Sequence, residues 1–271
     1  MCIRDSGRRG PLGAALRLPY FTATAWYHKK LPDDLQNKYL PQVLALSEDY
    51  SINQLMPLMA KGNSATNEEK QEAAKTMARF SGISEKAILS YNLDVPTTFF
   101  WKELLRDEGY TIGRLDSRYK GIDKIAGGDR PDYWAELTSW NHSFAPAINY
   151  YFKNILKFET DVKYNLFGSV RPWDWKNNNS GESLRKAMAA NPYLHTMIQS
   201  GYYDGATRYF DAKYTMWQLD PSGKMKDRLS FEGYRSGHMM YLREVDLIKS
   251  NSDIRKFIKK TTPSSNEPAK Y

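Results

Sequence analysis

The C-terminal part of the chain alternates between strand-like and helical patterns. Two short apolar runs, LHTMIQSGYYD and RLSFEGYRSG, are each followed by a longer segment with apolar residues at helical spacing. Strands that alternate with helices favour a parallel sheet, in which ligands and catalytic groups lie at the carboxyl ends of the strands. The sequence therefore predicts the end of an α/β sheet over residues 164–260, with the first of the two runs as a buried strand and a further strand in VKYNLFGS.

The preceding residues have a different character. From residue 16 to residue 163 short helical segments follow one another, apart from a strand and turn expected in YTIGRLDSRYKGIDK. One helix is predicted to open with a capping box, because Thr66 is followed three residues later by Glu69, and to end at Gly82. A helix is also expected over SFAPAINYYFKNILKF. We therefore expect a helical cap or insertion over 16–163, followed by a sheet region over 164–260.

Neither end of the chain contributes to the predicted fold. MCIRDS at the start resembles translated sequencing-adapter sequence, and GRRGPLGAAL after it has neither a helical nor a strand pattern. Residues 1–15 are therefore expected to be non-native or artefactual. Residues 261–271 are polar and rich in Pro and Ser, which is typical of a flexible tail.

Composition narrows the possible partners. The net charge is +8, but the basic residues are scattered among acids, with no zinc-finger spacing or helix-turn-helix signature, so a nucleic-acid partner is not expected. No apolar run approaches the roughly 18–20 residues of a membrane span. Cys2 is the single cysteine, which excludes an intrachain disulfide without deciding the compartment. No histidines have metal-ligand spacing, so neither a zinc site nor another cofactor is expected.

An acid and a histidine follow the two predicted strands. Asp204 comes at the end of the first apolar run, and His238 comes 34 positions later (238 − 204), after the second. A carboxylate that orients an imidazole, which in turn acts as a base toward a nucleophile, is the arrangement of serine hydrolases. Because both residues are expected at the same edge of the sheet, they could form two members of such a triad. A loop aspartate and an unrelated surface histidine remain the alternative, since acid–histidine pairs are common.

The nucleophile of such a triad is not evident in the chain. The G-x-S-x-G turn that carries the serine of α/β-hydrolases does not occur in the 271 residues. Ser183 lies in a GES triplet, but Leu184 and Arg185 follow where the sharp turn needs a glycine. We therefore expect Ser183 at the start of a helix.

The remaining histidines are weaker candidates. His28 lies in an aromatic helical stretch and is expected to be a packed surface residue. His142 is flanked by Asn141 and Ser143, which favours a helix-capping segment. His195 is predicted at the beginning of the strand before Asp204, which is the opposite end from the expected catalytic edge.

Several of these segments together resemble the serine carboxypeptidases. The segments are TATAWYHKKLP, GRLDSRYKG, GYYDGAT and RSGHMM, and the similarity extends roughly from Pro19 to Lys260. It is strongest to the bacterial branch of the carboxypeptidase C/Y-like family.

The resemblance implies an α/β-hydrolase fold with a helical cap. It implies an enzyme that removes the C-terminal residue of a peptide through an acyl-enzyme, and this chain alone is expected to be inactive. Asp204 would be the triad acid, His238 the general base, and Met239 would line the pocket for the departing residue. The family's G-E-S-Y-G nucleophile and W-N-G-G-P-G segment would lie upstream, which makes the chain a C-terminal fragment.

The resemblance also implies the partners. The substrate would be a peptide with a free C-terminal carboxylate, with no cofactor, and the location would be periplasmic or secreted. The sequence leaves the oligomeric state open. The alternatives are another capped serine hydrolase, such as an esterase or aminopeptidase, and a non-catalytic binding protein that uses the helical segment as an interaction surface.

Overall fold

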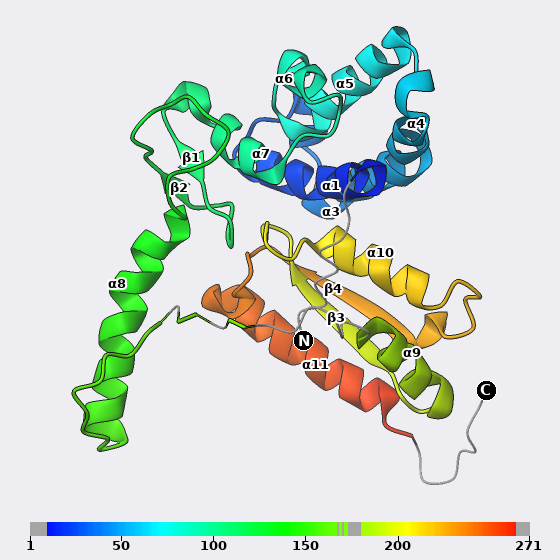
Figure 1. Cartoon of the computed structure of the whole chain (residues 1–271). Helices are drawn as coiled ribbons and strands as arrows, with labels where there is room; N and C mark the ends of the chain where they lie inside the picture. The colour runs from blue at the N-terminus through cyan, green and yellow to red at the C-terminus, as the bar shows by residue number, and fades with distance from the viewer. Residues whose placement is uncertain (1–9, 167, 170, 173–179, 264–271) are drawn as a thin grey trace.

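The computed structural model describes residues 10–166, 168, 169, 171, 172 and 180–263. A cluster of helices lies on one side of the molecule and a small parallel sheet with three helices on the other (Figure 1). A β-hairpin and a long helix, α8, extend at the edge of both (Figure 1). The expectation of a mixed α/β chain with a parallel sheet and a helical region is confirmed.

Helix α1 is the centre of the helical region. It runs from Pro11 to Tyr27, and every residue from Gly13 to Ala25 except Arg17 is buried. A helix that is apolar on all sides is stable when other helices cover it. Here α3 and α5 pack against it, and Phe21 stacks on Phe100 with ring centroids 4.0 Å apart. The other helical elements of this region are α2 (Asp33–Gln36), α3 (Leu40–Tyr50), η1 (Ser51–Leu55), α4 (Met56–Ala60), η2 (Gly62–Ser64), α5 (Asn67–Ser81), α6 (Glu85–Ser90), α7 (Thr97–Glu103) and η3 (Arg106–Glu108).

The start of α1 differs from the sequence-based expectation. GRRGPLGAAL was expected to be neither helix nor strand, yet α1 begins at Pro11, and Ala14 and Ala15 are buried in the core. Proline is well suited to the first turn of a helix because its fixed φ is helical and its absent N–H needs no partner there. The small residues after Pro11 then allow other elements to pack closely. The motif MCIRDS and Cys2 lie outside the described residues.

The predicted ends of α5 are confirmed. The Thr66 hydroxyl accepts a hydrogen bond from the Glu69 N–H at 3.1 Å, and the Glu69 carboxylate accepts one from the Thr66 N–H at 2.9 Å. Gly82 ends the helix with a φ of 71°, a left-handed conformation that glycine adopts without steric cost.

The sheet region has the predicted alternating order. It contains α9 (Ser180–Ala190), β3 (Thr196–Gly201), α10 (Tyr209–Leu219), η5 (Lys226–Arg228), β4 (Leu229–Tyr234), η6 (Met240–Leu242) and α11 (Glu244–Thr261). Strands β3 and β4 are parallel, and their paired residues run from Thr196 opposite Leu229 to Gly201 opposite Tyr234. The register therefore places the carboxyl ends of both strands side by side.

Two expectations about strands are wrong. VKYNLFGS forms no strand in its described residues, 162–166, 168 and 169. Val162 is 79% exposed, and an extended segment without a partner strand cannot satisfy its backbone hydrogen bonds. Strand β3 was expected to be buried, but its first five residues are only half-buried, because the described helices leave part of the sheet accessible.

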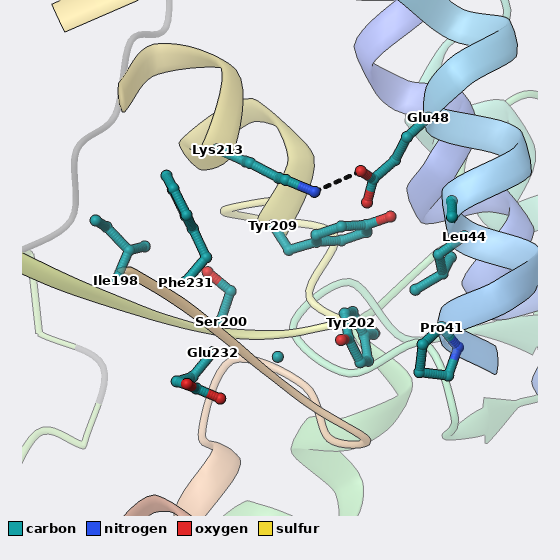
Figure 2. Close-up of a pocket in the computed structure, with 12 residues that line it drawn as sticks. Pro41, Leu44, Glu48, Ile198, Ser200, Tyr202, Tyr209, Lys213, Phe231 and Glu232 are labelled. Carbon is teal, nitrogen blue, oxygen red and sulfur yellow. Dashed lines mark hydrogen bonds and ion pairs between the residues drawn. The ribbon is translucent and has the colours of Figure 1, made fainter. Parts of the chain in front are cut away.

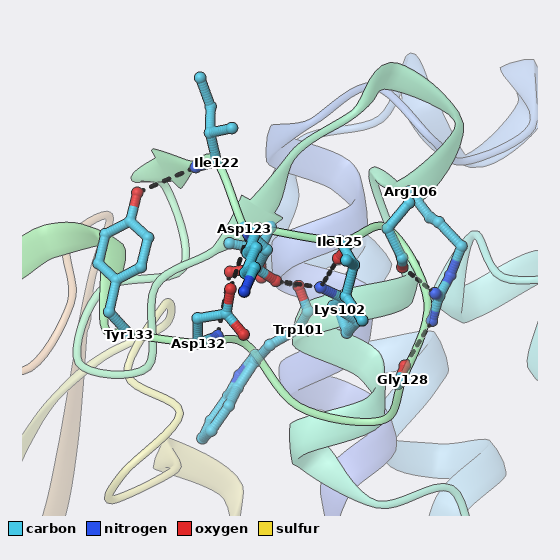
Figure 3. A network of polar contacts seen from close by, with 12 residues as sticks. Trp101, Lys102, Arg106, Ile122, Asp123, Ile125, Gly128, Asp132 and Tyr133 are labelled. Carbon is cyan, nitrogen blue, oxygen red and sulfur yellow. Dashed lines mark hydrogen bonds and ion pairs between the residues drawn. The ribbon is translucent and has the colours of Figure 1, made fainter.

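A polar network fixes the segment between the hairpin and α8. The hairpin pairs β1 (Thr111–Ile112) with β2 (Lys120–Gly121), and the chain then loops to α8 (Ala135–Tyr150) and the π-helical turn η4 (Tyr151–Ile155). Figure 3 shows Lys102, 2% exposed, paired with Asp123 and donating to the Ile125 carbonyl at 2.6 Å. Asp123 also accepts the Asp132 N–H at 3.0 Å. A buried ammonium needs such partners, so the network fixes the loop that leads into α8.

Helix α8 begins earlier than predicted. SFAPAINYYFKNILKF was expected to form it, but its first residue is Ala135, eight positions before Ser143 (143 − 135). Its start is anchored in the molecule, since Ala135 and Glu136 are buried, whereas Tyr150 and Tyr151 at its other end are exposed. Within the described ranges, no helix is both long enough and apolar enough to cross a membrane.

Candidate active site

The chain turns sharply after β3 and places Asp204 at the carboxyl edge of the sheet. The Asp204 N–H bonds to the Gly201 carbonyl at 3.3 Å, and the residue is 4% exposed. Its Oδ1 accepts the backbone N–H groups of Ala206 at 2.8 Å and Thr207 at 3.0 Å. The carboxylate is therefore fixed by its own turn before α10 begins.

His238 reaches the same carboxylate from the segment after β4. Its Nδ1 lies 2.8 Å from Asp204 Oδ2. Because a carboxylate oxygen can only accept, Nδ1 carries the proton and the neutral ring presents an unprotonated Nε2. The parallel register explains how residues 34 positions apart meet, since Gly201 and Tyr234 end their strands side by side. The structure thus brings the two predicted residues together.

The environment of the pair raises the pKa of His238 above its ordinary value. The hydrogen bond that His238 donates to Asp204 is the main cause that raises the pKa of His238, while partial burial and the positive charge of Arg114 act in the opposite direction. The Thr207 hydroxyl donates to Asp204 Oδ2 at 2.5 Å and lies 3.2 Å from His238 Nδ1. A carboxylate held in this way can orient an imidazole and stabilise the imidazolium that forms when Nε2 takes a proton.

The third member of a triad is not found among the described residues. There the hydrogen-bond partners of the His238 side chain are Asp204 and Thr207, and no serine hydroxyl is one of them. Ser183 lies in the first turn of α9, close to the helix start expected for it. Met239 directly follows His238 and is half-buried, so it is placed beside the pair, and its role in binding substrate stays a prediction.

The other histidines do not join the pair. His28 donates from Nε2 to the Ser117 carbonyl at 2.8 Å, and burial lowers its pKa. His195 directly precedes β3, as predicted, at the end of the strand opposite Asp204. His142 lies exposed within α8, so the capping expectation is wrong, and the Ser143 hydroxyl instead donates to the Ser139 carbonyl at 3.0 Å.

Sequence reasoning missed three features around the pair. Thr207 contacts both members, and the spacing of an aspartate and a threonine three residues later is a turn signal that could have indicated it. The hairpin loop of residues 113–118 hydrogen-bonds both segments that carry the pair, although the sequence suggested only a turn there. Glu136 is fully buried, whereas a glutamate in the first turn of a helix is ordinarily read as a favourable surface charge.

A separate cavity of about 210 Å³ lies between α3, α10 and one face of the sheet (Figure 2). Ile198 and Phe231 line its apolar side. On its polar side Lys213 forms an ion pair with Glu48 at 2.5 Å. Both charges are used by this pair, and the lining contains neither Asp204 nor His238. The cavity is therefore distinct from the acid–histidine site.

Neither metal chemistry nor similarity to known proteins identifies the site. In the part of the chain that the structure describes, no group of three or more His, Cys, Asp or Glu side chains could hold a metal ion. Comparison with protein-family models, with curated proteins and with solved structures finds no match.

Proposed function

We propose that the chain is the C-terminal part of a serine-type carboxypeptidase with an α/β-hydrolase fold. The hydrogen bond between Asp204 and His238 at the carboxyl edge of a parallel sheet is the observation that carries this proposal. It supplies two of the three groups of a triad in the order and position that α/β-hydrolases use. The helical region would act as the cap of the cleft.

Each residue has a defined part in the proposed reaction. His238 Nε2 takes the proton of the serine hydroxyl as the serine attacks the scissile carbonyl, and it later returns a proton to the departing amino acid. Asp204 holds the imidazole with Nε2 unprotonated and stabilises the imidazolium. Met239 contacts the side chain of the departing residue. The substrate is a peptide with a free C-terminal carboxylate.

The serine in this proposal belongs to a segment that is not among the 271 residues. The absence of a G-x-S-x-G turn from the sequence supports this, and so does the absence of a serine partner of His238 among the described residues. We expect the chain by itself to hydrolyse no peptide and to react with no fluorophosphonate probe. Labelling at Ser183, or at any other serine of the chain, would contradict this assignment.

The role of Asp204 is tested in the protein that also contains the serine-bearing segment. Asp204→Asn should lower kcat by roughly 10⁴-fold, the scale for losing the correct histidine tautomer. Asp211→Asn is the matched control, because Asp211 lies in α10 and pairs with Arg208 at 2.7 Å. This control should leave kcat near that of the wild type. Equal losses in both variants would overturn the assignment of the triad acid.

The substrate class needs a separate comparison, since an esterase or aminopeptidase could use the same pair. A peptide with a free C-terminal carboxylate should be hydrolysed much faster than the same peptide with a C-terminal amide. Preference for a simple ester, or for a free N-terminus, would favour another capped serine hydrolase.

A further inference from the structure

We propose that the 113–118 loop, anchored by Glu136, is the element that positions Asp204 and His238 relative to each other. The effect of this loop on hydrolysis rests on the proposed function. The placement of His238 against Asp204 can be measured without any reaction. The loop joins β1 to β2 and belongs to neither strand of the parallel sheet. It therefore contacts the pair from outside the elements that carry it.

The loop first holds the turn that carries Asp204. The Arg114 carbonyl accepts the Gly205 N–H at 2.9 Å, and the Ser117 N–H donates to the Tyr203 carbonyl at 3.0 Å. The residues on both sides of Asp204 are thus bonded to the loop. A side chain at Gly205 would not fit, because a Cβ there would lie 2.6 Å from the Tyr20 hydroxyl oxygen.

The same loop also holds the segment that carries His238. The Leu115 carbonyl accepts the His238 N–H at 2.7 Å, and the Arg118 guanidinium donates to the Arg235 carbonyl at 3.0 Å. A Cβ at Gly237 would lie 2.5 Å from the Leu115 carbonyl oxygen, so the two backbones are packed too closely for a side chain there. Adjacent carbonyls of one loop, those of Arg114 and Leu115, therefore bond one to each of the two segments that carry the pair.

Glu136 determines the direction of the Arg114 carbonyl and holds the backbone on the N-terminal side of the Leu115 carbonyl. Its Oε1 accepts the Leu115 N–H at 2.7 Å, and its Oε2 accepts the Arg114 N–H at 3.1 Å. In a trans peptide the N–H and C=O point in opposite directions. When the Leu115 N–H points to Glu136, the Arg114 carbonyl, which shares its peptide unit, must point away, toward Gly205. Glu136 is thus a positioning residue that acts through the backbone of the loop.

The Glu136 carboxylate is buried, and a buried charge is unfavourable unless hydrogen-bond donors surround it. Glu136 is 0% exposed, and burial raises its pKa while the two backbone N–H groups act to lower it. No lysine or arginine side chain bonds to it among the described residues. Two backbone N–H groups thus take the place of water around the Glu136 carboxylate. This environment suits a residue that fixes the loop better than a surface charge.

The test compares Glu136→Gln with Asp123→Asn by NMR of the chain labelled with ¹⁵N-histidine. Glutamine has the size of glutamate, but its NH₂ group is a donor where glutamate has an acceptor oxygen. This NH₂ group would face a backbone N–H of the loop, and two donors cannot bond to each other. Asp123 is similarly buried and accepts one backbone N–H, yet it lies in the Lys102 network and contacts neither member of the pair. Both variants are expected to be less stable, and only Glu136→Gln should disturb His238.

The expected result is a loss of the hydrogen-bonded Nδ1 proton signal of His238. Its pKa should also fall toward the ordinary value of about 6.5, as it should in Asp204→Asn. An unchanged His238 in folded Glu136→Gln, or an equal change in Asp123→Asn, would overturn the proposal. If Glu136→Gln does not fold, Arg118→Met decides, because Arg118 is partly exposed and its loss should weaken the Nδ1 signal in the same direction. An unaltered His238 in that variant would equally overturn it.

In the complete protein, Glu136→Gln should lower kcat by about 10²-fold with little change in KM, the scale for a small misplacement of catalytic groups. If Asp204→Asn leaves hydrolysis intact while the NMR result holds, the proposed function fails and the positioning role stands. If Asp204→Asn abolishes hydrolysis but Glu136→Gln leaves the His238 signals unchanged, the proposed function stands and the positioning role of the loop fails.

Discussion

The helical region and the sheet region differ in how completely they cover their own apolar side chains. Helix α1 is buried over almost its entire middle, within a cluster that includes Phe21, Phe100 and Trp101. The sheet region has a small separate cluster of Met188, Met216 and Leu219, and β3 is only half-buried. Parallel sheets are normally covered on both faces, whereas the described residues leave part of this sheet accessible.

The acid–histidine pair lies in the less completely packed region, but its backbone contacts connect it to the other. Tyr203 belongs to a cluster that also contains Leu16 of α1 and Leu44 of α3. The 113–118 loop adds hydrogen bonds from the hairpin to the same segment. The geometry of the pair can therefore be well defined even though the sheet around it is partly open.

The largest effect on stability is expected for Phe100→Ala. Phe100 is fully buried and stacks on Phe21, so its truncation should leave a cavity and cost about 3–5 kcal/mol of unfolding free energy. Urea unfolding followed by tryptophan fluorescence measures this. Ile258→Ala on α11, where the side chain is 55% exposed, is the control and should change stability by about 0.5 kcal/mol or less. A similar loss in both variants would mean that the Ile258 side chain is packed in solution and that the contrast between the regions does not hold.

A smaller effect is expected for Met216→Ala in the sheet region. Met216 is fully buried, but its cluster has few members and borders half-buried residues such as Ile198 and Phe231, which can relax into the space. A loss near the lower end of the roughly 2–5 kcal/mol for such truncations should follow. Amide hydrogen exchange gives the complementary measurement, because β3 and β4 should exchange faster than α1 in the wild type. Slower exchange in the strands would contradict the comparison.

Sequence patterns predicted the local elements well where the local signal was strong. Thr66, Glu69 and Gly82 gave the limits of α5, and the alternation after residue 180 gave β3, β4 and their helices in the right order. The same alternation led to Asp204 and His238, since parallel strands bring their carboxyl ends together. Whether the whole fold is that of an α/β-hydrolase stays a prediction.

Other features could not be predicted from short stretches of sequence, because they depend on tertiary contacts. The start of α1 at Pro11 depends on burial of small residues that carry no helical pattern. VKYNLFGS has strand-like alternation but forms no strand in its described residues, so the alternation alone was misleading. Glu136 bonds the backbone of the 113–118 loop, and the loop in turn bonds backbone groups of Tyr203, Gly205 and His238, which lie far away in the sequence. Side-chain patterns give no signal for such backbone contacts.

Substitutions on the exposed apolar face of α11 are expected to change stability even less, but to change solubility more. Leu247, Ile254 and Ile258 lie at helical spacing and are 48%, 39% and 55% exposed. Replacing Leu247 and Ile258 by serine should reduce binding of an apolar dye and self-association, while the unfolding free energy changes by about 0.5 kcal/mol per site. Large destabilisation would show that this face is packed in solution.

The smallest effect is the dependence of stability on pH through His238. Its pKa in the folded protein is raised by Asp204 above the ordinary value near 6.5, so the folded state binds the proton more tightly than the unfolded state. The stabilisation is fully present below about pH 6.5 and is lost as the pH rises through the folded pKa. Because the side chain is one-third exposed and screened by water, the effect should stay below about 1 kcal/mol.

His28 and His195, whose pKa values are lowered, contribute with the opposite sign, so the slope of the wild type alone does not isolate His238. The informative quantity is the stability of the wild type minus that of His238→Gln, measured by urea unfolding between pH 5.5 and 8.5. This difference should shrink as the pH rises. In an Asp204→Asn background it should become nearly constant, because the partner that raises the pKa is gone. A difference that grows with pH would show that His238 is held neutral, and that its contact with Asp204 does not form in solution.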